Sequence, residues 1–325
     1  MSHPEIRRPR FERSPIRPMV LTSRDLDILR AVHRHRLLRS THLVALLGGS
    51  RQTTLRRLQL LFHHGYLDRP LMQLDWYARG SEPLVYALGN RGAELLEREG
   101  GLKRGGIRWE AKKRNVSRVF LHHTLAVAEV MVAFEVACRS REGVRFIPPE
   151  EMLALAPEAT RRLRLPFRWQ VEVREGGKPY RLGVEPDRVF GLEFHGAPEN
   201  RRRAYFFLEA DRGTMPVARK GLGQTSFARK LICYQETWRQ GIQRSHLGIS
   251  NFRVLTVTTN RERVEHLVEA CRSLGSGGSG LFLFADRENL ARGDILTHEW
   301  VNGRGEVVYL VTMTNQLAMA SYFFC

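Results

Sequence analysis

Over residues 21–97 the apolar positions of the chain follow the rhythm of helices first and of strands afterwards. Leu26, Leu29 and Val32 recur at the spacing of one helical face, which predicts a first helix. A second short helix fits residues 40–47, because two glycines directly after the last apolar position would end it. The segment therefore opens with two helices in close succession.

A third helix is predicted from the segment RQTTLRRLQLLFHHG, with Ser50 as its amino-terminal cap and Gly65 at its end. Leu55, Leu58 and Phe62 share one face of this helix and should pack inward. The opposite face is polar and rich in arginine, which makes it the surface that a partner would meet.

Two short strands complete the pattern, at residues 66–72 and 84–88, with a glycine-bearing loop between them. Three helices followed by two strands are the order of elements in a winged helix-turn-helix, in which one helix enters the DNA major groove. A helix over residues 91–99 closes this module. The same module also serves in protein interaction and dimerisation, so its fold alone does not establish DNA binding.

The rest of the chain alternates between helical and strand-like segments. A long amphipathic helix comes first, and strands rich in aromatic and β-branched residues follow it. The predicted elements are a helix at 117–140, strands at 167–173, 180–192 and 203–211, a helix at 226–239, a strand at 252–259, a helix at 261–274, and added strands at 281–286 and 307–313. This order predicts a mixed sheet flanked by helices, in the α+β or α/β class.

A length of 325 residues favours two domains. Changes in composition along the chain suggest where they begin and end, since glycine-rich and basic stretches are typical of linkers and mobile termini. The expected parts are a disordered basic arm at 1–20, the winged helix at 21–99, a basic linker at 100–116, and an α/β domain with a carboxy-terminal extension at 117–325.

The charge of the chain indicates an anionic partner. Lys and Arg number 52 against 34 for Asp and Glu, a formal net charge of +18. Such an excess attracts phosphate backbones and releases their counterions, and arginine and glutamine can also make paired hydrogen bonds to base edges. Residues expected to contact double-stranded DNA are Arg51, Gln52, Thr53, Arg56 and Arg57 on the third helix, Arg79 between the two strands, and Lys112, Lys113 and Arg114 in the linker. The alternative for Arg56 and Arg57 is a solvated helix face.

Cysteine usage and hydropathy favour a cytoplasmic protein. The four cysteines, Cys138, Cys233, Cys271 and Cys325, form no C-x-x-C pair, so neither a disulfide framework nor a zinc site is expected. No apolar run is expected to reach the length of a membrane span, and the first 18 residues lack the apolar core of a secretory signal. We therefore expect no membrane partner.

Three carboxylates are expected to meet at one edge of the sheet. Glu209 and Asp211 stand two positions apart near the end of one predicted strand, so their side chains should point the same way. Asp187 follows Pro186 on the preceding strand and would join them if the two strands pair. Such a group could hold Mg²⁺, which could activate water at a phosphodiester. The alternative is a structural ion network with Arg188, Arg212 or Arg229.

A strand ending in Pro-Asp, followed by a strand carrying Glu-x-Asp, resembles the PD-(D/E)xK nuclease fold. The whole layout over residues 20–275 is similar to the plasmid replication-relaxation family: a winged helix, a helix resembling HHTLAVAEVMVAFEVA, the segments EPDRVFGL and FFLEADRGT, and a helix carrying Lys230 and Tyr234. This resemblance implies a DNA-binding protein of plasmids or other mobile elements, acting in replication or in relaxation of DNA.

The chain departs from the nuclease pattern at Asp211, where such a nuclease usually has lysine. Lys220 or, better placed, Lys230 could substitute from the following helix; if neither does, the domain is a nuclease relic used for binding. Tyr234 could attack phosphorus, although a tyrosine on an amphipathic helix is usually a packing residue.

Three hypotheses follow from the sequence. The first is a DNA-binding protein of a mobile element with a catalytically silent second domain. The second is a Mg²⁺-dependent nickase or relaxase that uses Asp187, Glu209, Asp211 and Lys230 as catalytic residues, the three carboxylates being the metal ligands. The third is a transcription regulator whose second domain senses a ligand or dimerises. A homodimer and replication or transfer proteins remain open as further partners.

Overall fold

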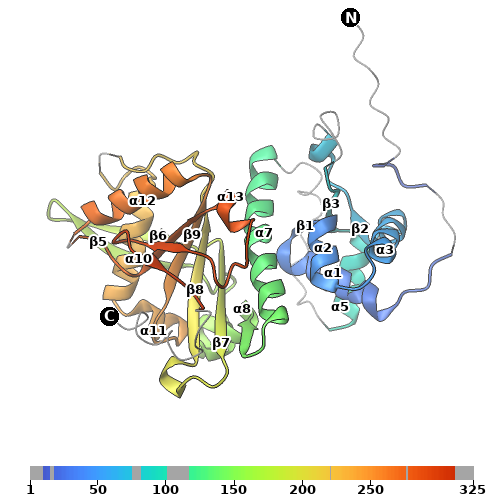
Figure 1. Ribbon diagram of the computed structural model, residues 1–325, viewed down its shortest axis with the longest axis horizontal. Coiled ribbons are helices and arrows are strands. Elements are labelled where there is room, and N and C mark those ends of the chain that lie inside the picture. Colours follow the sequence, from blue (N-terminus) through green and yellow to red (C-terminus); the bar gives the residue numbers. More distant parts are fainter. Residues whose placement is uncertain are drawn as a thin grey trace, which may run out of the picture. The chain divides into compact units, whose positions relative to one another are not determined.

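The structure is a computed structural model, in which the chain forms two compact units, Met1–Val132 and Ala133–Cys325 (Figure 1). The division falls inside the helix α7 (Arg118–Ser140). The residues that the structure describes are 10–14, 18–74, 82–100, 117–219, 221–275 and 277–311. Most of the predicted linker at 100–116 lies outside these ranges, and the predicted domain limits stay a prediction.

The first unit contains the three predicted helices and a small antiparallel sheet with the strand order β1–β3–β2. Its elements are α1 (Ser23–His35), β1 (Leu37–Arg39), α2 (Ser40–Leu47), α3 (Arg51–His63), β2 (Leu67–Asp68), a 3-10 turn (Leu71–Gln73), β3 (Val85–Leu88) and α5 (Asn90–Arg98). The order of elements predicted from the sequence is confirmed. The loop predicted to form the wing lies mostly at 75–81, outside the described residues.

Two details of this unit differ from the prediction. The strand expected over 66–72 stops after Asp68, because Pro70 offers no amide to a ladder and begins the 3-10 turn instead. The three-residue strand β1 was not predicted, since so short a run shows no periodicity.

The turn between α2 and α3 depends on two glycines. Gly48 and Gly49 have φ values of 62° and 70°, in the left-handed region that other residues rarely adopt. The Ser50 hydroxyl then accepts a hydrogen bond from the Thr53 amide at 3.3 Å and caps α3. Both signals for this turn were readable in the sequence.

The packed face of α3 was predicted with one exception. Leu58 and Phe62 are buried as expected, whereas Leu55 is only half-buried. Thr54 and Leu61 are fully buried and complete the inward face. The inward stripe is therefore rotated slightly from the predicted one, and the exposed face begins at Arg51.

The helix α7 (Arg118–Ser140) corrects one expectation from the sequence. Its 23 residues are long and apolar enough to cross a membrane by length and composition alone, although no such run was expected. More than half of its most apolar stretch, 56%, is buried inside the protein, as in the core helix of a folded domain. In the first unit Leu121 and Leu125 of this helix pack against Leu37 and Val85.

The second unit is built on a seven-stranded sheet with the order β12–β11–β10–β9–β8–β7–β4. Pairs β8–β9 and β9–β10 are parallel and the other pairs are antiparallel, so the sheet is mixed, as the sequence predicted. Its strands are β4 (Val144–Ile147), β7 (Arg188–Phe194), β8 (Arg203–Ala210), β9 (Arg253–Thr258), β10 (Phe282–Asp286), β11 (Trp300–Asn302) and β12 (Val307–Val308). A separate hairpin pairs β5 (Trp169–Glu175) with β6 (Lys178–Val184).

Helices and short turns complete this unit and flank its sheet (Figure 1). They are α8 (Pro149–Leu155), α9 (Glu158–Arg161), a 3-10 turn (Glu199–Arg201), α10 (Phe227–Arg239), α11 (Ile242–Leu247), α12 (Arg261–Ser273) and α13 (Arg287–Leu290). The sequence predicted α10 and α12 to within a residue of their ends, and it missed the shorter helices.

The single strand predicted over 180–192 is wrong. The structure divides it into β6 and β7, which belong to different sheets. The break lies at 185–187, where Pro186 lacks the amide that a continuous ladder would use. This break leaves Asp187 directly before the first residue of β7, at the end of that strand in the large sheet.

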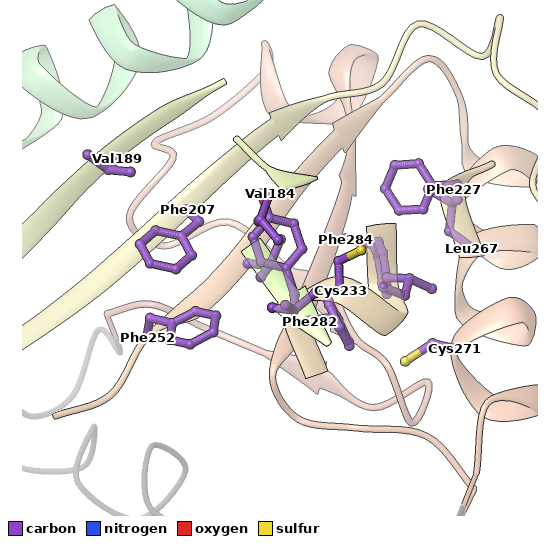
Figure 2. Packing of buried hydrophobic residues seen from close by; sticks show 14 of the residues in the cluster. Val184, Val189, Phe207, Phe227, Cys233, Phe252, Leu267, Cys271, Phe282 and Phe284 are labelled. Carbon is purple, nitrogen blue, oxygen red and sulfur yellow. The ribbon is translucent and has the colours of Figure 1, made fainter. Parts of the chain in front are cut away.

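The main core lies between one face of the sheet and the helices α10 and α12 (Figure 2). Phe207 of β8 and Phe252 stack there with ring centroids 4.4 Å apart, and Leu267 of α12 packs in the same cluster. On the other face Phe190 of β7 meets Phe134, whose ring centroid is 4.6 Å away. After the exposed Arg203 at its start, β8 carries no further charged side chain until Glu209, one residue before its end.

We expect the stability of the first unit to depend on His42. Burial, together with the positive charges of Arg39 and His35, lowers the pKa of His42 to about 4, and its Nδ1 accepts the Arg39 amide at 3.4 Å. In the unfolded chain His42 binds a proton near pH 6.5, whereas in the folded unit it binds one only near pH 4. The free energy of unfolding should therefore fall as the pH drops from about 6.5 towards 4, by up to about 3 kcal/mol. Denaturant unfolding at pH 7 and pH 5 measures this loss.

The matched variant is His42→Gln, which keeps an acceptor for the Arg39 amide but does not titrate. It should lose less stability on acidification than the unchanged protein. An equal loss in both proteins would assign the pH dependence to other histidines, such as His63 and His298, whose pKa values burial also lowers.

Candidate functional site

The solvent-facing side of α3 presents arginine and glutamine, as predicted. Its exposed side chains are Arg51, Gln52, Thr53, Arg56 and Gln59. Among the residues that the structure describes, neither Arg51 nor Arg56 has a side-chain partner, so both guanidinium groups are available to a ligand. Helix α3 can therefore offer several hydrogen-bond donors along one face.

Arg57 differs from its neighbours, because its guanidinium is held inside the unit. Its Nε donates to Asp25 Oδ1 at 2.8 Å, its Nη2 pairs with Oδ2 of the same carboxylate, and it also donates to the Val20 carbonyl at 3.1 Å. Asp25 is fully buried and accepts two further hydrogen bonds from Thr22, at 2.8 Å each. Arg57 thus fastens α3 to the start of α1, a role that the helical projection did not show.

The other basic residues predicted to bind DNA lie outside the described residues: Arg79, Lys112, Lys113 and Arg114. Lys220, the second candidate for the nuclease lysine, lies outside them as well. The described part of the predicted basic arm includes residues 10–14. There Arg13 donates to the Phe62 carbonyl at 3.0 Å and pairs with Asp68, so this part contacts the unit.

In the second unit Glu209 is buried at the end of β8, with only 2% of its surface exposed. Two residues of α10 reach it: Lys230 forms an ion pair with Oε2, and the Tyr234 hydroxyl donates to Oε1 at 2.5 Å. Lys230 is the residue that the sequence indicated as the better of the two candidate lysines. The comparison with the nuclease pattern thus pointed to the cation that meets Glu209.

The electrostatics of this cluster follow from its burial. Burial raises the pKa of the Glu209 carboxyl above its ordinary value; Lys230 opposes the rise and Asp187 adds to it. Burial alone would lower the pKa of the Lys230 ammonium, but the carboxylates of Glu209 and Asp187 outweigh it and the pKa is raised. Burial and Glu209 raise the pKa of Tyr234 well above its ordinary value. Both causes favour the protonated phenol, which donates its hydrogen bond to Glu209.

Asp211 is bound by a different helix. One carboxylate oxygen accepts from Thr258 Oγ1 at 2.8 Å and from Arg263 Nε at 2.9 Å, and the other accepts the Gly213 amide at 3.2 Å. Arg263 lies in the first turns of α12 and also donates to the Met215 carbonyl at 2.6 Å. The predicted ion network named arginines close in sequence, whereas Arg263 is 52 residues away and reaches Asp211 because β8 and β9 are parallel neighbours.

Asp187 lies next to these two carboxylates at the sheet edge. Its Oδ2 accepts the Ala210 amide at 2.8 Å, and its own amide donates to the Leu208 carbonyl at 3.0 Å. The three predicted residues are thus brought to the end of β8. Among the described residues, however, no group of three or more His, Cys, Asp or Glu side chains is arranged to hold a metal ion.

The donor set explains why Mg²⁺ does not fit these residues. A Mg²⁺ site needs carboxylate oxygens that can turn to the metal. Here the oxygens of Glu209 and Asp211 already accept hydrogen bonds from Lys230, Tyr234 and Arg263. The cluster has the hydrogen bonding of a buried ion network.

A cavity of about 210 Å³ adjoins the ion pair between Glu209 and Lys230. The carboxylate of Glu209 and the side chains of Lys230 and Tyr234 lie on its wall. Its remaining lining comes from the end of β6, from the segment between β8 and α10, and from α10 itself: Gly183, Val184, Glu185, Met215, Thr225, Ser226, Arg229 and Cys233. The thiol of Cys233 is unreactive here, because burial raises its pKa to about 11.

Comparison with known proteins gives one finding. The family model described as replication-relaxation matches residues 29–252, which include α3, the β8 carboxylates and α10. No curated protein and no solved structure matches the chain.

We expect Asp211→Asn to lower the stability of the protein. The substitution leaves the largely buried guanidinium of Arg263 without its counterion, and breaking such a pair costs about 3 kcal/mol. A carboxylate from a repulsive metal site would behave in the opposite way, because its removal relieves like-charge repulsion. Thermal unfolding of Asp211→Asn, beside the exposed control Glu185→Gln, separates the two roles: a raised midpoint in Asp211→Asn would contradict the ion network.

Proposed function

The chain belongs to the replication-relaxation family, and on that premise we propose that it binds double-stranded DNA through α3 and acts in the replication or relaxation of a plasmid or other mobile element. One observation carries the proposal. The exposed face of α3 presents Arg51, Gln52, Thr53 and Arg56 with both of these guanidinium groups free among the described residues.

The order of elements supports docking through α3. A helix that follows a tight glycine turn, packs against α2 and β2 and exposes its first two turns matches the recognition helix of a helix-turn-helix. Arg51 and Gln52 stand in its first turn, where side chains reach base edges in such modules, and Arg56 lies one turn later. The net charge of +18 supplies attraction to phosphate that does not depend on base sequence.

We propose that the carboxylates of the second unit serve as a scaffold. Glu209 fastens α10 to the sheet and Asp211 fastens α12, each through one cation. The second unit would then position DNA or a partner protein, and it need not cut DNA to do so. Replication or transfer proteins and a second copy of the chain are the partners that fit this role.

A cytoplasmic location agrees with the cysteines. Cys138, Cys233 and Cys271 are buried free thiols in the described part of the chain, as expected in a reducing compartment.

We expect the double variant Arg51→Ala/Arg56→Ala to weaken binding to duplex DNA. If each arginine neutralises one phosphate, the slope of log K against log salt concentration should become shallower by about 0.9 per arginine, and the affinity at moderate salt should fall about tenfold. Fluorescence anisotropy with a labelled duplex over a salt series measures both quantities. Unchanged affinity and slope would exclude α3 as the DNA-contacting element.

Two further variants sharpen this experiment. Arg98→Ala removes an exposed arginine on α5 and should leave binding unchanged. Arg57→Met should lose about 3 kcal/mol of unfolding free energy, because Asp25 keeps a buried charge without its cation. Footprinting then tells a replication or transfer origin from a promoter, which a transcription regulator would select.

A nicking assay tests the catalytic alternative. The specific observation in its favour is that Lys230 reaches Glu209, as a lysine of a nuclease site would. On the scaffold proposal, supercoiled plasmid bound by the protein should stay supercoiled in Mg²⁺ or Mn²⁺. Nicks that require the metal and disappear in Asp187→Ala would overturn the scaffold proposal and establish a nickase.

A further inference from the structure

An exposed segment of the second unit concentrates arginine next to leucine. Residues 161–168, here named the arginine segment, connect α9 to β5 and read RRLRLPFR. All four arginines are exposed, and the leucines at 163 and 165 are each 49% exposed. Large apolar side chains that stay in water beside several cations are typical of an interaction surface.

The arginine segment is held in place by hydrogen bonds. The Leu163 amide donates to the Thr160 carbonyl at 3.0 Å, and the Arg168 amide donates to the Leu165 carbonyl at 3.1 Å. His246 of α11 contacts the Pro166 carbonyl through Nε2 at 2.8 Å and the Thr160 hydroxyl through Nδ1 at 3.4 Å. A ligand would therefore meet a surface that is already ordered, which lowers the entropy cost of binding.

The charges of the arginine segment are only partly neutralised. Arg162 pairs with Glu158 on the adjacent helical turn, and Arg168 lies 3.8 Å from Glu185. The side chains of Arg161 and Arg164 have no partner among the described residues. Exposed pairs of this kind are weak, so an anionic ligand can displace them at little cost.

The arginine segment ends beside the cavity over Glu209. Arg168 directly precedes β5, whose first residue, Trp169, is in register with Val184 of β6. Val184 and Glu185 both line that cavity, and Glu185 is the residue that approaches Arg168. The arginine segment thus leads towards the cavity wall.

We propose that the arginine segment binds single-stranded nucleic acid. Arginines bind phosphates through paired hydrogen bonds, and the exposed leucines offer apolar contacts to sugars and unstacked bases. A duplex hides its base faces and offers nothing for the leucines to contact, and in the proposed function its phosphates are bound by α3. This proposal rests on the proposed function, since replication and relaxation both produce separated strands.

An acidic peptide is the competing occupant, because it too could pair with arginine and cover leucine. The charge of the whole chain favours nucleic acid: a net charge of +18 attracts long polyanions far more strongly than short acidic peptides. Single-stranded nucleic acid is therefore the occupant to which the proposal commits.

The test uses the full-length protein, a labelled oligothymidylate and a labelled hairpin duplex. Arg161→Ala/Arg164→Ala should weaken oligothymidylate binding about tenfold, make its salt slope shallower by about 0.7 per arginine, and leave duplex affinity within about twofold. The matched control is Arg202→Ala/Arg292→Ala, which removes two exposed arginines elsewhere in the second unit that also lack a side-chain partner among the described residues. Because the side chains of Arg161 and Arg164 have no partner among the described residues, Arg161→Ala/Arg164→Ala should keep the melting temperature of the unchanged protein.

A second double variant tests the contribution of the two exposed leucines to single-strand binding. Leu163→Ser/Leu165→Ser should weaken oligothymidylate binding several-fold without altering its salt slope, since no charge is removed. Both leucines are half-exposed, so folding should survive.

Three outcomes would overturn the proposal: unchanged oligothymidylate binding in Arg161→Ala/Arg164→Ala, equal losses for single strand and duplex, or stronger competition by poly-glutamate than by unlabelled oligothymidylate. Failure of the proposed function has a different signature. In that case Arg51→Ala/Arg56→Ala would leave duplex affinity unchanged, whatever happens to the single strand.

Discussion

A carboxylate taken out of water must find a cation or hydrogen-bond donors, and three buried carboxylates of this protein find a cation. Asp25 in the first unit and Glu209 and Asp211 in the second are almost completely buried. Each pairs with one cation that a helix supplies: Arg57 from α3, Lys230 from α10 or Arg263 from α12. An ion removed from water without a partner costs several kcal/mol, so each pair fixes the position of the helix that supplies the cation. The placement of α3, α10 and α12 follows from these three contacts together with the apolar core.

The same requirement sorts the cations of the chain into two kinds. A formal net charge of +18 suggests a general affinity for polyanions, but Arg57 and Arg263 are committed to buried carboxylates. Arg56, one position from Arg57, is exposed without a side-chain partner among the described residues. A binding surface is therefore defined by which arginines remain free after the buried acids have been neutralised, and the sequence count alone does not reveal this.

Local patterns predicted the elements well where one physical signal dominates. The bounds of α2 follow from two glycines at its end, and those of α10 and α12 follow from regular apolar spacing. Lys230 was indicated as the partner of the carboxylate end of β8 because it stands on the next helix along the chain. The break at Pro186 between β6 and β7 was not predicted, because apolar residues continue on both sides of the proline and suggested one long strand. Arg263 could not be predicted, since its contact with Asp211 depends on β8 and β9 being neighbours, which only the folded sheet decides.

The carboxylates at the end of β8 show why residue types at one sheet edge do not identify their chemistry. Asp187, Glu209 and Asp211 lie where the sequence placed them, yet their oxygens accept hydrogen bonds from protein donors. A Mg²⁺ site needs carboxylate oxygens that are free to coordinate the metal. In this unit the oxygens of Glu209 and Asp211 are occupied by Lys230 and Arg263 instead. What remains accessible is the cavity beside Glu209 and Lys230, whose wall also carries Arg229 and Glu185. Arg161 and Arg164, which lack a side-chain partner among the described residues, lie on the segment that leads to this cavity, so the cations that remain for a ligand in this part of the unit stand outside the buried ion network.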